Sequence, residues 1–205
     1  MTQKVQLLLS VLPVLVGCSR PATVESNPPA VTAAPAQTAA AASAAPVLAA
    51  TAAPSNESSL LAVGSDVPDV SAVAQDGKTV RLRGLLGKPL IVYFYPKDDT
   101  PGCTIEAKGI RDQYQELKSH ALVFGVSTDD QGSHQAFAEK YSLPFDLLVD
   151  SSHALANAFG VPLSSGHAKR VTFVIDKSGK VSKVFPNVNP DGHAQELLDA
   201  VKALG

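Results

Sequence analysis

The chain has 205 residues, a formal net charge of −2 at pH 7 and a sequence pI near 6.2. Its basic residues are scattered along the chain, so neither sign of charge gathers into the kind of surface that binds nucleic acid or acidic membranes. The sequence contains two cysteines, Cys18 and Cys103, so any internal disulfide would have to join this pair.

Residues 1–17 have the composition of a targeting segment. A short positive stretch precedes the apolar run 5–16, which is too short to span a bilayer as a helix. The run ends in Leu-Val-Gly-Cys at 15–18, which resembles the lipobox of bacterial lipoproteins. This resemblance implies lipidation of Cys18 and an anchor in the bacterial cell envelope that faces the periplasm. Ser19 slightly favours the outer membrane, and an ordinary secretory signal with an incidental cysteine is the alternative.

Residues 18–59 are predicted to be a disordered tether. Between 21 and 56 the only charged residue is Glu25, and Ala, Pro, Thr and Ser dominate without any aromatic residue. Such a stretch buries too little apolar surface to offset the entropy of ordering, and its prolines interrupt helix formation. At about 3.1 Å per residue it would reach on the order of 100 Å from a membrane. Residues 60–205 contain all the aromatic residues and suit one domain.

The domain pattern alternates between buried strands and amphipathic helices. A hairpin over 70–73 and 80–82 turns at Asp76-Gly77, and a fully apolar strand over 90–95 ends at Pro96. The further expected elements are a helix over 106–119, a strand over 121–127, a helix over 131–141, a strand over 145–149, a helix over 151–159 capped by Ser151 or Ser152, a hairpin of strands 171–176 and 180–185, and a helix over 190–204. This order predicts an α/β domain whose mostly parallel or mixed central sheet is flanked by helices, with a β-hairpin at its N-terminal end.

The strand over 90–95 leads into YFYPKDDTPGCT at 93–104. This sequence places Cys103 in a tight turn where a helix is about to begin. A thiol at a helix N-terminus faces unpaired backbone N–H groups and the positive end of the helix dipole, and both favour the thiolate. Cys103 is therefore a candidate nucleophile.

The element order resembles the thioredoxin fold, and the motif narrows the resemblance. The sequence PKDDTPGC at 96–103 matches the peroxiredoxin pattern of Pro, three residues, Thr, two residues and Cys, and Arg170 follows in KRVTF at 169–173. The resemblance covers about 63–205 and is closest to the bacterioferritin-comigratory, or Q-type, subfamily. It implies a thioredoxin-like fold and a thiol peroxidase of the thioredoxin-dependent class, with Pro96, Thr100, Cys103 and Arg170 as the catalytic set.

Each member of this set has an expected role. The Cys103 thiolate would attack a peroxide oxygen and become a sulfenic acid. The Thr100 hydroxyl would lie beside the sulfur and the peroxide, and the Arg170 guanidinium would hold the thiolate and the polarised oxygens. Pro96 would shield the sulfur from water. The backbone N–H groups of Gly102 and Cys103 would complete the substrate-binding site.

One departure from the subfamily concerns regeneration of the thiol. Many members carry a resolving cysteine five residues after the nucleophile, where this chain has Lys108. We therefore expect a one-cysteine enzyme that reduces hydrogen peroxide and organic hydroperoxides and depends on an external thiol: a thioredoxin-like protein, glutaredoxin or glutathione. We expect no metal or other cofactor. We expect the protein to contact the membrane only through the N-terminal lipid, and to be a monomer or a weak dimer.

The alternative is a thioredoxin-fold redox or binding module without peroxidase activity. Such a module normally needs a second close cysteine, but Thr100 and Glu106 occupy the nearby positions. The other residues around the motif are predicted to be structural: Tyr93 and Phe94 in the core, Lys97, Asp98 and Asp99 in a solvated turn, Glu106 at the helix N-terminus, and His120, His134, His153, His167 and His193 at the surface.

Overall fold

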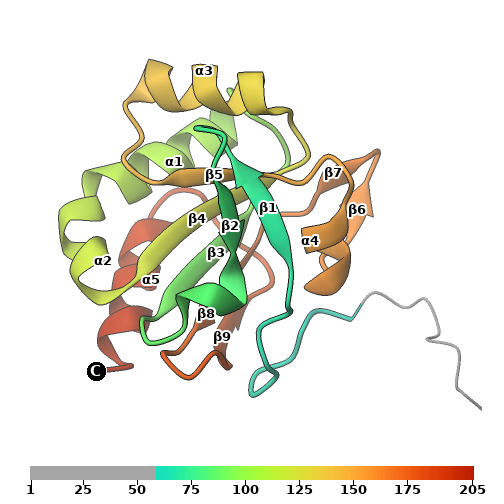
Figure 1. Cartoon of the computed structure of the whole chain (residues 1–205). Helices are drawn as coiled ribbons and strands as arrows, with labels where there is room; N and C mark the ends of the chain where they lie inside the picture. Colours follow the sequence, from blue (N-terminus) through green and yellow to red (C-terminus); the bar gives the residue numbers. More distant parts are fainter. Residues whose placement is uncertain (1–58) are drawn as a thin grey trace, which may run out of the picture. The chain divides into compact units, whose positions relative to one another are not determined.

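The structure, a computed structural model, describes residues 59–205. The expected targeting segment, the lipidation site at Cys18 and the expected tether up to residue 58 lie outside the described residues. In the described part, a seven-stranded sheet has the order β2-β1-β5-β4-β3-β8-β9 (Figure 1). The expected thioredoxin-like α/β architecture is confirmed.

The sheet is mixed, in agreement with the mostly parallel or mixed sheet that the sequence predicts. Its strands are β1 (Ser71–Ala74), β2 (Thr79–Arg81), β3 (Leu90–Phe94), β4 (Leu122–Ser127), β5 (Asp146–Val149), β8 (Val171–Ile175) and β9 (Val181–Phe185). The β3–β4 and β4–β5 pairs are parallel, whereas β1 with β2, β1 with β5, β3 with β8, and β8 with β9 are antiparallel. Both hairpins thus add antiparallel strands at the two sides of a short parallel centre.

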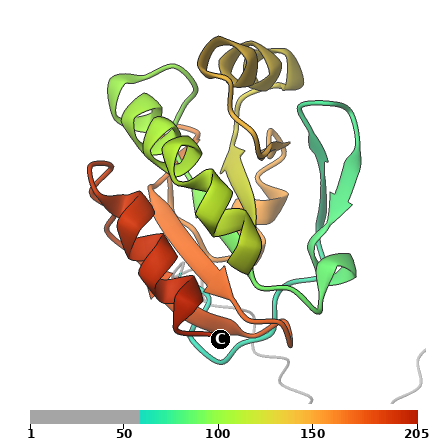
Figure 2. The ribbon, with the colours of Figure 1, turned by 90° about the vertical axis from the view of Figure 1, so that its left-hand side faces the viewer.

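Helices cover both faces of this sheet. The helices are α1 (Pro101–Asp112), α2 (Tyr114–His120), α3 (Gln131–Tyr141), α4 (Ala154–Ala158) and α5 (His193–Lys202). In Figure 2, α1, α2 and α5 lie side by side in front of the sheet, and contacts between α1, α2 and α5 agree with this view. One apolar core joins these helices and α3 to the sheet, and a second core lies under α4 and the 3-10 helix Leu82–Leu85.

Several boundaries differ from the sequence prediction. The helix expected over 106–119 begins five residues earlier, at Pro101, and divides into α1 and α2 at Gln113. The predicted Ser151 or Ser152 cap of α4 is wrong: His153 precedes the helix, and the buried Asp150 carboxylate accepts hydrogen bonds from the backbone N–H groups of Leu155 and Ala156. The short hairpin of β6 (Leu163–Ser164) and β7 (His167–Ala168) was not expected.

The sheet topology positions two distant segments side by side. Strand β3 is fully buried and pairs antiparallel with β8, with Phe94 opposite Val171. The end of β3, which leads into α1, therefore meets the start of β8, which Arg170 precedes. This arrangement brings the 96–103 turn and Arg170 to one edge of the sheet.

Candidate functional site

Cys103 lies in the first turn of α1. Thr100 precedes the helix with extended backbone, Pro101 occupies the first helical position, and no side chain caps the helix. Proline suits this position because its missing N–H would be unpaired there in any case. No hydrogen bond within residues 59–205 uses the backbone N–H groups of Gly102 or Cys103. The sulfur therefore lies at a helix N-terminus with open donors, as the sequence predicted.

The Cys103 side chain is buried, and a guanidinium reaches it. Cys103 is 2% exposed, and Arg170 Nη2 donates to Cys103 Sγ at 3.2 Å. The structure thus brings together the two predicted site residues that are 67 positions apart in the chain. A permanent cation in direct contact stabilises negative charge on the sulfur.

Glu106 completes this group, in a role that the sequence analysis did not assign. It lies three residues after Cys103 on the same buried face of α1, and its carboxylate accepts from Arg170 Nη1. Glu106 is 1% exposed, and its Oε1 has no hydrogen-bond partner among the described residues. Burial raises the pKa of Glu106 to about 7 despite the opposing effect of Arg170.

The guanidinium is held from three sides. Glu106 accepts a hydrogen bond from Arg170 Nη1 and Cys103 accepts one from Nη2. Burial lowers the pKa of Arg170, but these two contacts outweigh it and raise the pKa. Gly102 lies against its remaining side: a Cβ at this position would be 3.3 Å from Arg170 Nη2 and 3.7 Å from Pro190 Cγ. Glycine is therefore the residue that lets the backbone of α1 approach the guanidinium this closely.

Thr100 and Pro96 lie in the same turn, half-buried. The expected contact between the Thr100 hydroxyl and the sulfur is not among the hydrogen bonds of residues 59–205; instead the hydroxyl donates to the Lys97 carbonyl at 3.0 Å. This bond closes the turn and leaves the lone pairs of the hydroxyl oxygen available to an incoming donor.

Tyr93 lies in the same core cluster as Cys103. Its side chain is buried, as predicted, but its hydroxyl lacks a hydrogen-bond partner within the described part of the chain. Burial, together with the negative charges of Glu106, Asp98 and Cys103, raises its pKa. The phenol therefore stays neutral.

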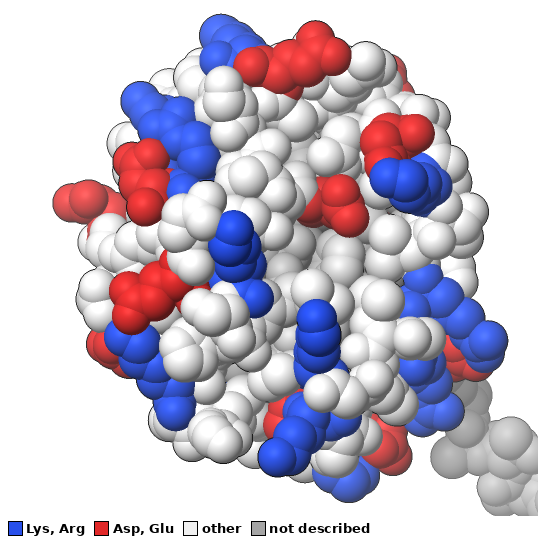
Figure 3. Space-filling model, turned by 60° about the vertical axis from the view of Figure 1, so that its left-hand side comes forward, with Lys and Arg blue, Asp and Glu red and all other residues white. Residues whose placement is uncertain are grey.

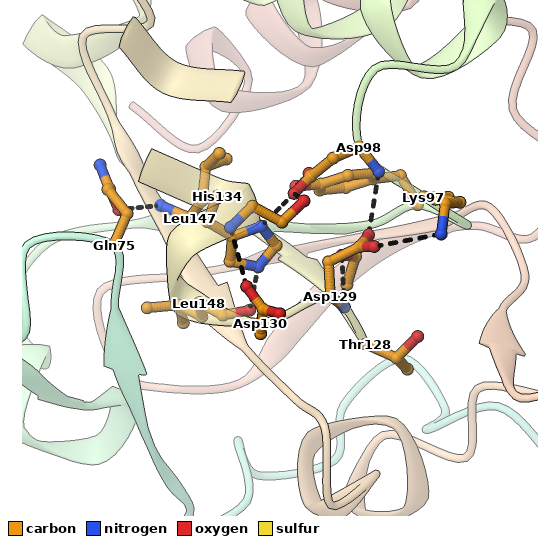
Figure 4. Close-up of polar contacts among 12 residues, drawn as sticks. Gln75, Lys97, Asp98, Thr128, Asp129, Asp130, His134, Leu147 and Leu148 are labelled. Carbon is orange, nitrogen blue, oxygen red and sulfur yellow. Dashed lines mark hydrogen bonds and ion pairs between the residues drawn. The ribbon is translucent and has the colours of Figure 1, made fainter. Parts of the chain in front are cut away.

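The prediction that the 97–99 turn is solvated is wrong for Asp98, which is 6% exposed. Its carboxylate accepts from the Tyr95 hydroxyl at 2.8 Å and the Ser133 hydroxyl at 2.7 Å, and it contacts His134 Nδ1 at 2.8 Å (Figure 4). Burial would raise the pKa of Asp98, but these hydrogen bonds outweigh it and lower the pKa. Asp99 remains exposed, with Lys140 and the Tyr141 hydroxyl as partners.

The prediction that all five histidines lie at the surface is also wrong. His120 is exposed and His153 and His167 are half-buried, but His134 and His193 are 0% exposed. His193 contacts the Thr172 hydroxyl and the Glu196 carboxylate, each at 2.9 Å, and burial lowers its pKa despite Glu196. Sequence alone gave no signal for these partners, since both histidines bind groups on other segments or one turn away.

The face in Figure 3 carries charges of both signs close to one another rather than one large patch of a single sign. Within residues 59–205 no group of three or more His, Cys, Asp or Glu side chains is arranged to hold a metal ion. Over the same range, none of the helices combines the length and apolar character needed to cross a bilayer. What the site offers is a buried thiol, a guanidinium and a helix N-terminus.

Comparison with known proteins agrees with this arrangement. The AhpC/TSA family profile matches residues 63–184. Peroxiredoxin Bcp of Bacillus subtilis is 41% identical over 150 residues, which cover 69% of this chain and 96% of that protein. The crystal structure of peroxidoxin BcpB from Mycobacterium tuberculosis superposes with a TM-score of 0.65 at 36% identity, over 70% of this chain and 97% of that one.

A second solved structure is similar to the same extent. The bacterioferritin comigratory protein of Xanthomonas campestris, whose structure was described in terms of alkyl peroxide reduction, has a TM-score of 0.65 at 33% identity, over 69% of this chain and 98% of that one. The fold, the matched profile and these relatives agree in one assignment. The chain belongs to the Bcp/Q-type peroxiredoxins of the AhpC/TSA family, a class of thiol peroxidases that take peroxides as substrates and thiols as reductants.

Proposed function

We propose that this chain is a one-cysteine peroxiredoxin in which Cys103 reduces hydrogen peroxide and organic hydroperoxides. The observation that carries the proposal is the contact of Arg170 Nη2 with Cys103 Sγ at the open N-terminus of α1. In the proposed step the thiolate attacks one peroxide oxygen and the O–O bond breaks. Cys103 becomes a sulfenic acid, and the departing oxygen leaves as water or an alcohol once protonated.

Each site residue has a separate proposed role in this step. Arg170 holds the thiolate and the polarised peroxide oxygens, and the N–H groups of Gly102 and Cys103 bind the same oxygens. The Thr100 oxygen accepts a hydrogen bond from the peroxide while its own O–H donates to the Lys97 carbonyl. Pro96 borders the turn and limits access of water.

Regeneration of the thiol requires a second molecule. Lys108 stands where many Q-type members have a resolving cysteine, and among residues 59–205 Cys103 is the one cysteine and is free. The sulfenic acid is proposed to react with an external thiol to give water and a mixed disulfide. The external thiol is a thioredoxin-like protein, glutaredoxin or glutathione. A second equivalent of thiol then releases Cys103.

The location of the enzyme is part of the proposal. The lipobox-like sequence ending at Cys18 supports a lipid anchor in the bacterial envelope. The Ala- and Pro-rich stretch 18–59 is proposed to tether a periplasm-facing domain of residues 60–205. Radiolabelled palmitate incorporation by the expressed chain, lost in Cys18→Ser, would support the anchor, and equal incorporation by both chains would contradict it.

The peroxidase assignment is tested by stopped-flow consumption of hydrogen peroxide. Cys103→Ser is expected to abolish consumption, because an alcohol at this position forms no nucleophilic thiolate. Lys108→Ala, an exposed change on the same helix, is expected to consume peroxide at the wild-type rate. Consumption by Cys103→Ser at the wild-type rate would refute the assignment.

A further inference from the structure

His193 is the first residue of α5, and its ring bridges this helix to the sheet. The residue is fully buried, and its Nε2 lies 2.9 Å from the Thr172 hydroxyl oxygen on β8. Its Nδ1 lies 2.9 Å from the Glu196 carboxylate, one turn further along α5. Burial lowers the pKa of His193 despite Glu196, and the charge of Arg170 lowers it further, so the ring is neutral. Because a carboxylate can only accept, Nδ1 carries the proton and Nε2 accepts from the Thr172 hydroxyl.

The bond between His193 and Thr172 ties the start of α5 to the sheet. No side chain caps α5, and Gly192, which precedes the helix, has a left-handed backbone with a φ of 88°. Among the side-chain hydrogen bonds of residues 59–205, this one alone joins the segment 189–196 to the sheet. The Phe185 ring of β9 packs edge-on against the imidazole, with ring centroids 5.1 Å apart. The position of the helix start therefore depends on this buried pair.

The start of α5 also abuts the first turn of α1. A Cβ at Gly102 would be 3.7 Å from Pro190 Cγ and 3.3 Å from Arg170 Nη2, so the Gly102 backbone is close to both groups. Figure 2 shows α1 and α5 side by side, and contacts between the two helices agree with this view. A displacement of the start of α5 would thus move Pro190 away from Gly102.

These contacts close a ring through the site. Arg170 immediately precedes β8, and Thr172 lies two residues further along the chain. Both side chains reach the same layer of helices, since Arg170 contacts Cys103 of α1 at 3.2 Å and Thr172 contacts α5. From the sulfur, the path runs through Arg170 and along β8 to Thr172. From there it crosses to His193 and returns through Pro190 to the first turn of α1.

We propose, on the basis of the peroxidase function above, that His193 is a positioning residue for the contact between Arg170 and Cys103. Its bond to Thr172 holds the start of α5 on β8, and Pro190 then keeps the first turn of α1 against the guanidinium. Without this bond, the first turn of α1 moves away from Arg170 and the thiolate loses part of its stabilisation. His193 acts through these residues rather than on the sulfur or the peroxide.

The role is tested by alkylation of Cys103 with iodoacetamide, which reads the thiolate without any peroxide. Two substitutions separate the hydrogen bonds of the ring, because asparagine places an amide near the position of Nδ1 and glutamine places one near that of Nε2. His193→Asn, which does not reach Thr172, is expected to slow alkylation at pH 6.5 severalfold. It is expected to lower the rate constant with hydrogen peroxide roughly tenfold, since small misplacements of reacting groups are costly. His193→Gln is expected to retain most of both rates, because its amide still pairs with Thr172.

Further variants test the path of the effect. Thr172→Val removes the other partner of the bond and is expected to reproduce His193→Asn, and the two changes together are expected to cost no more than either alone. Glu196→Gln is the matched control: its amide oxygen still accepts from Nδ1, so both rates are expected to equal those of wild type. In an Arg170→Met background, His193→Asn is expected to slow alkylation no further, because His193 acts through the guanidinium.

The outcomes separate this proposal from the peroxidase function. Equal alkylation by wild type and a folded His193→Asn, or the same slowing by His193→Asn in the Arg170→Met background, would overturn the proposal. An equal loss in His193→Gln and His193→Asn would also overturn it, since the effect would then belong to the packing of the ring alone. If His193→Asn does not fold, Thr172→Val, measured alone and with Arg170→Met, decides the question in the same way. A failure of the peroxidase assignment would appear separately, as a wild-type chain whose variants alkylate as described but which consumes no peroxide.

Discussion

Arg170→Met tests the contact on which the site depends. Methionine keeps much of the length of the arginine side chain but removes the charge and both donors. The guanidinium lies 3.2 Å from the sulfur, and its side chain is 16% exposed. At this distance and an effective dielectric constant of about 20, the attraction to a thiolate is about 5 kcal/mol. This value is an upper limit, because solvent and the competing Glu106 carboxylate reduce it.

Removal of one preorganised donor from a charged transition state typically costs about 3 kcal/mol, or 10²- to 10³-fold in rate. We therefore expect the second-order rate constant of Arg170→Met with hydrogen peroxide to fall by roughly 10²- to 10³-fold in stopped-flow assays. Lys108→Ala, on the exposed side of α1, is expected to react at the wild-type rate. A rate constant for Arg170→Met within threefold of wild type would refute the role given to this residue.

Loss of the guanidinium also leaves Glu106 without its cation, so stability must be separated from rate. Arg170→Met/Glu106→Gln removes the unpaired buried carboxylate and is expected to recover stability in urea unfolding, because a neutral amide costs less to bury than a charge. The peroxide rate is expected to stay low in this double variant. Recovery of the rate together with stability would show that the arginine acts only in folding.

Three further predictions follow from the same geometry. The pKa of Glu106 rises from its ordinary value of 4.5 to about 7 in the fold, so the folded state holds this proton more tightly than the unfolded chain. The resulting contribution to stability is complete below pH 4.5 and is lost as the pH rises to about 7. Over this pH range the free energy of unfolding of wild type, measured in urea, is expected to fall by about 3 kcal/mol relative to that of Glu106→Gln, and a constant difference would contradict the prediction. Gly102→Ala is expected to displace the Arg170 guanidinium by a few tenths of an ångström and lower the peroxide rate severalfold with little loss of stability; an unchanged rate would show that Gly102 is not needed for the contact. Tyr93→Phe removes a buried hydroxyl that has no partner among residues 59–205 and is expected to stabilise the fold by about 1 kcal/mol, whereas clear destabilisation would reveal a partner for that hydroxyl.

Local patterns predicted the framework of this domain well. The strand over 90–95 is a continuous apolar run because β3 is covered on both faces, and such a run is visible in one sequence. The turn at Lys177-Ser178-Gly179 was predicted from its glycine, because glycine adopts a positive φ without strain. The structure confirms this, with a φ of 87° at Gly179. A mixed sheet was among the sequence predictions, but the antiparallel pairing of β3 with β8 was not readable, since strand direction depends on how distant segments pair.

The beginning of α1 shows why boundaries are harder to predict. Pro101 and Gly102 have poor helix propensity in a helix interior, so the composition favoured a later beginning at 106. Proline is well suited to the first helical position, and the structure uses it there. Glu106 could have been assigned from the same reasoning, because a helix that begins at Pro101 places residues 103 and 106 on one face.

The buried polar residues were beyond the reach of the sequence. Asp is mostly exposed in proteins and His is often partly exposed, so the sequence alone predicts a surface position for both Asp98 and His134. They are buried because they satisfy each other across 36 positions of the chain. Only the tertiary structure shows this pairing, whereas the pairing of Cys103 with Arg170 was expected from the family resemblance.

The central claim is that Cys103 alone is oxidised and then waits for an external thiol. Mass spectrometry of the chain after one equivalent of hydrogen peroxide, with dimedone present, tests it most directly. We predict one dimedone adduct at Cys103 within seconds, with the same result in Cys18→Ser and with no disulfide-linked species. An unmodified Cys103, or a disulfide formed in place of the adduct, would contradict the account.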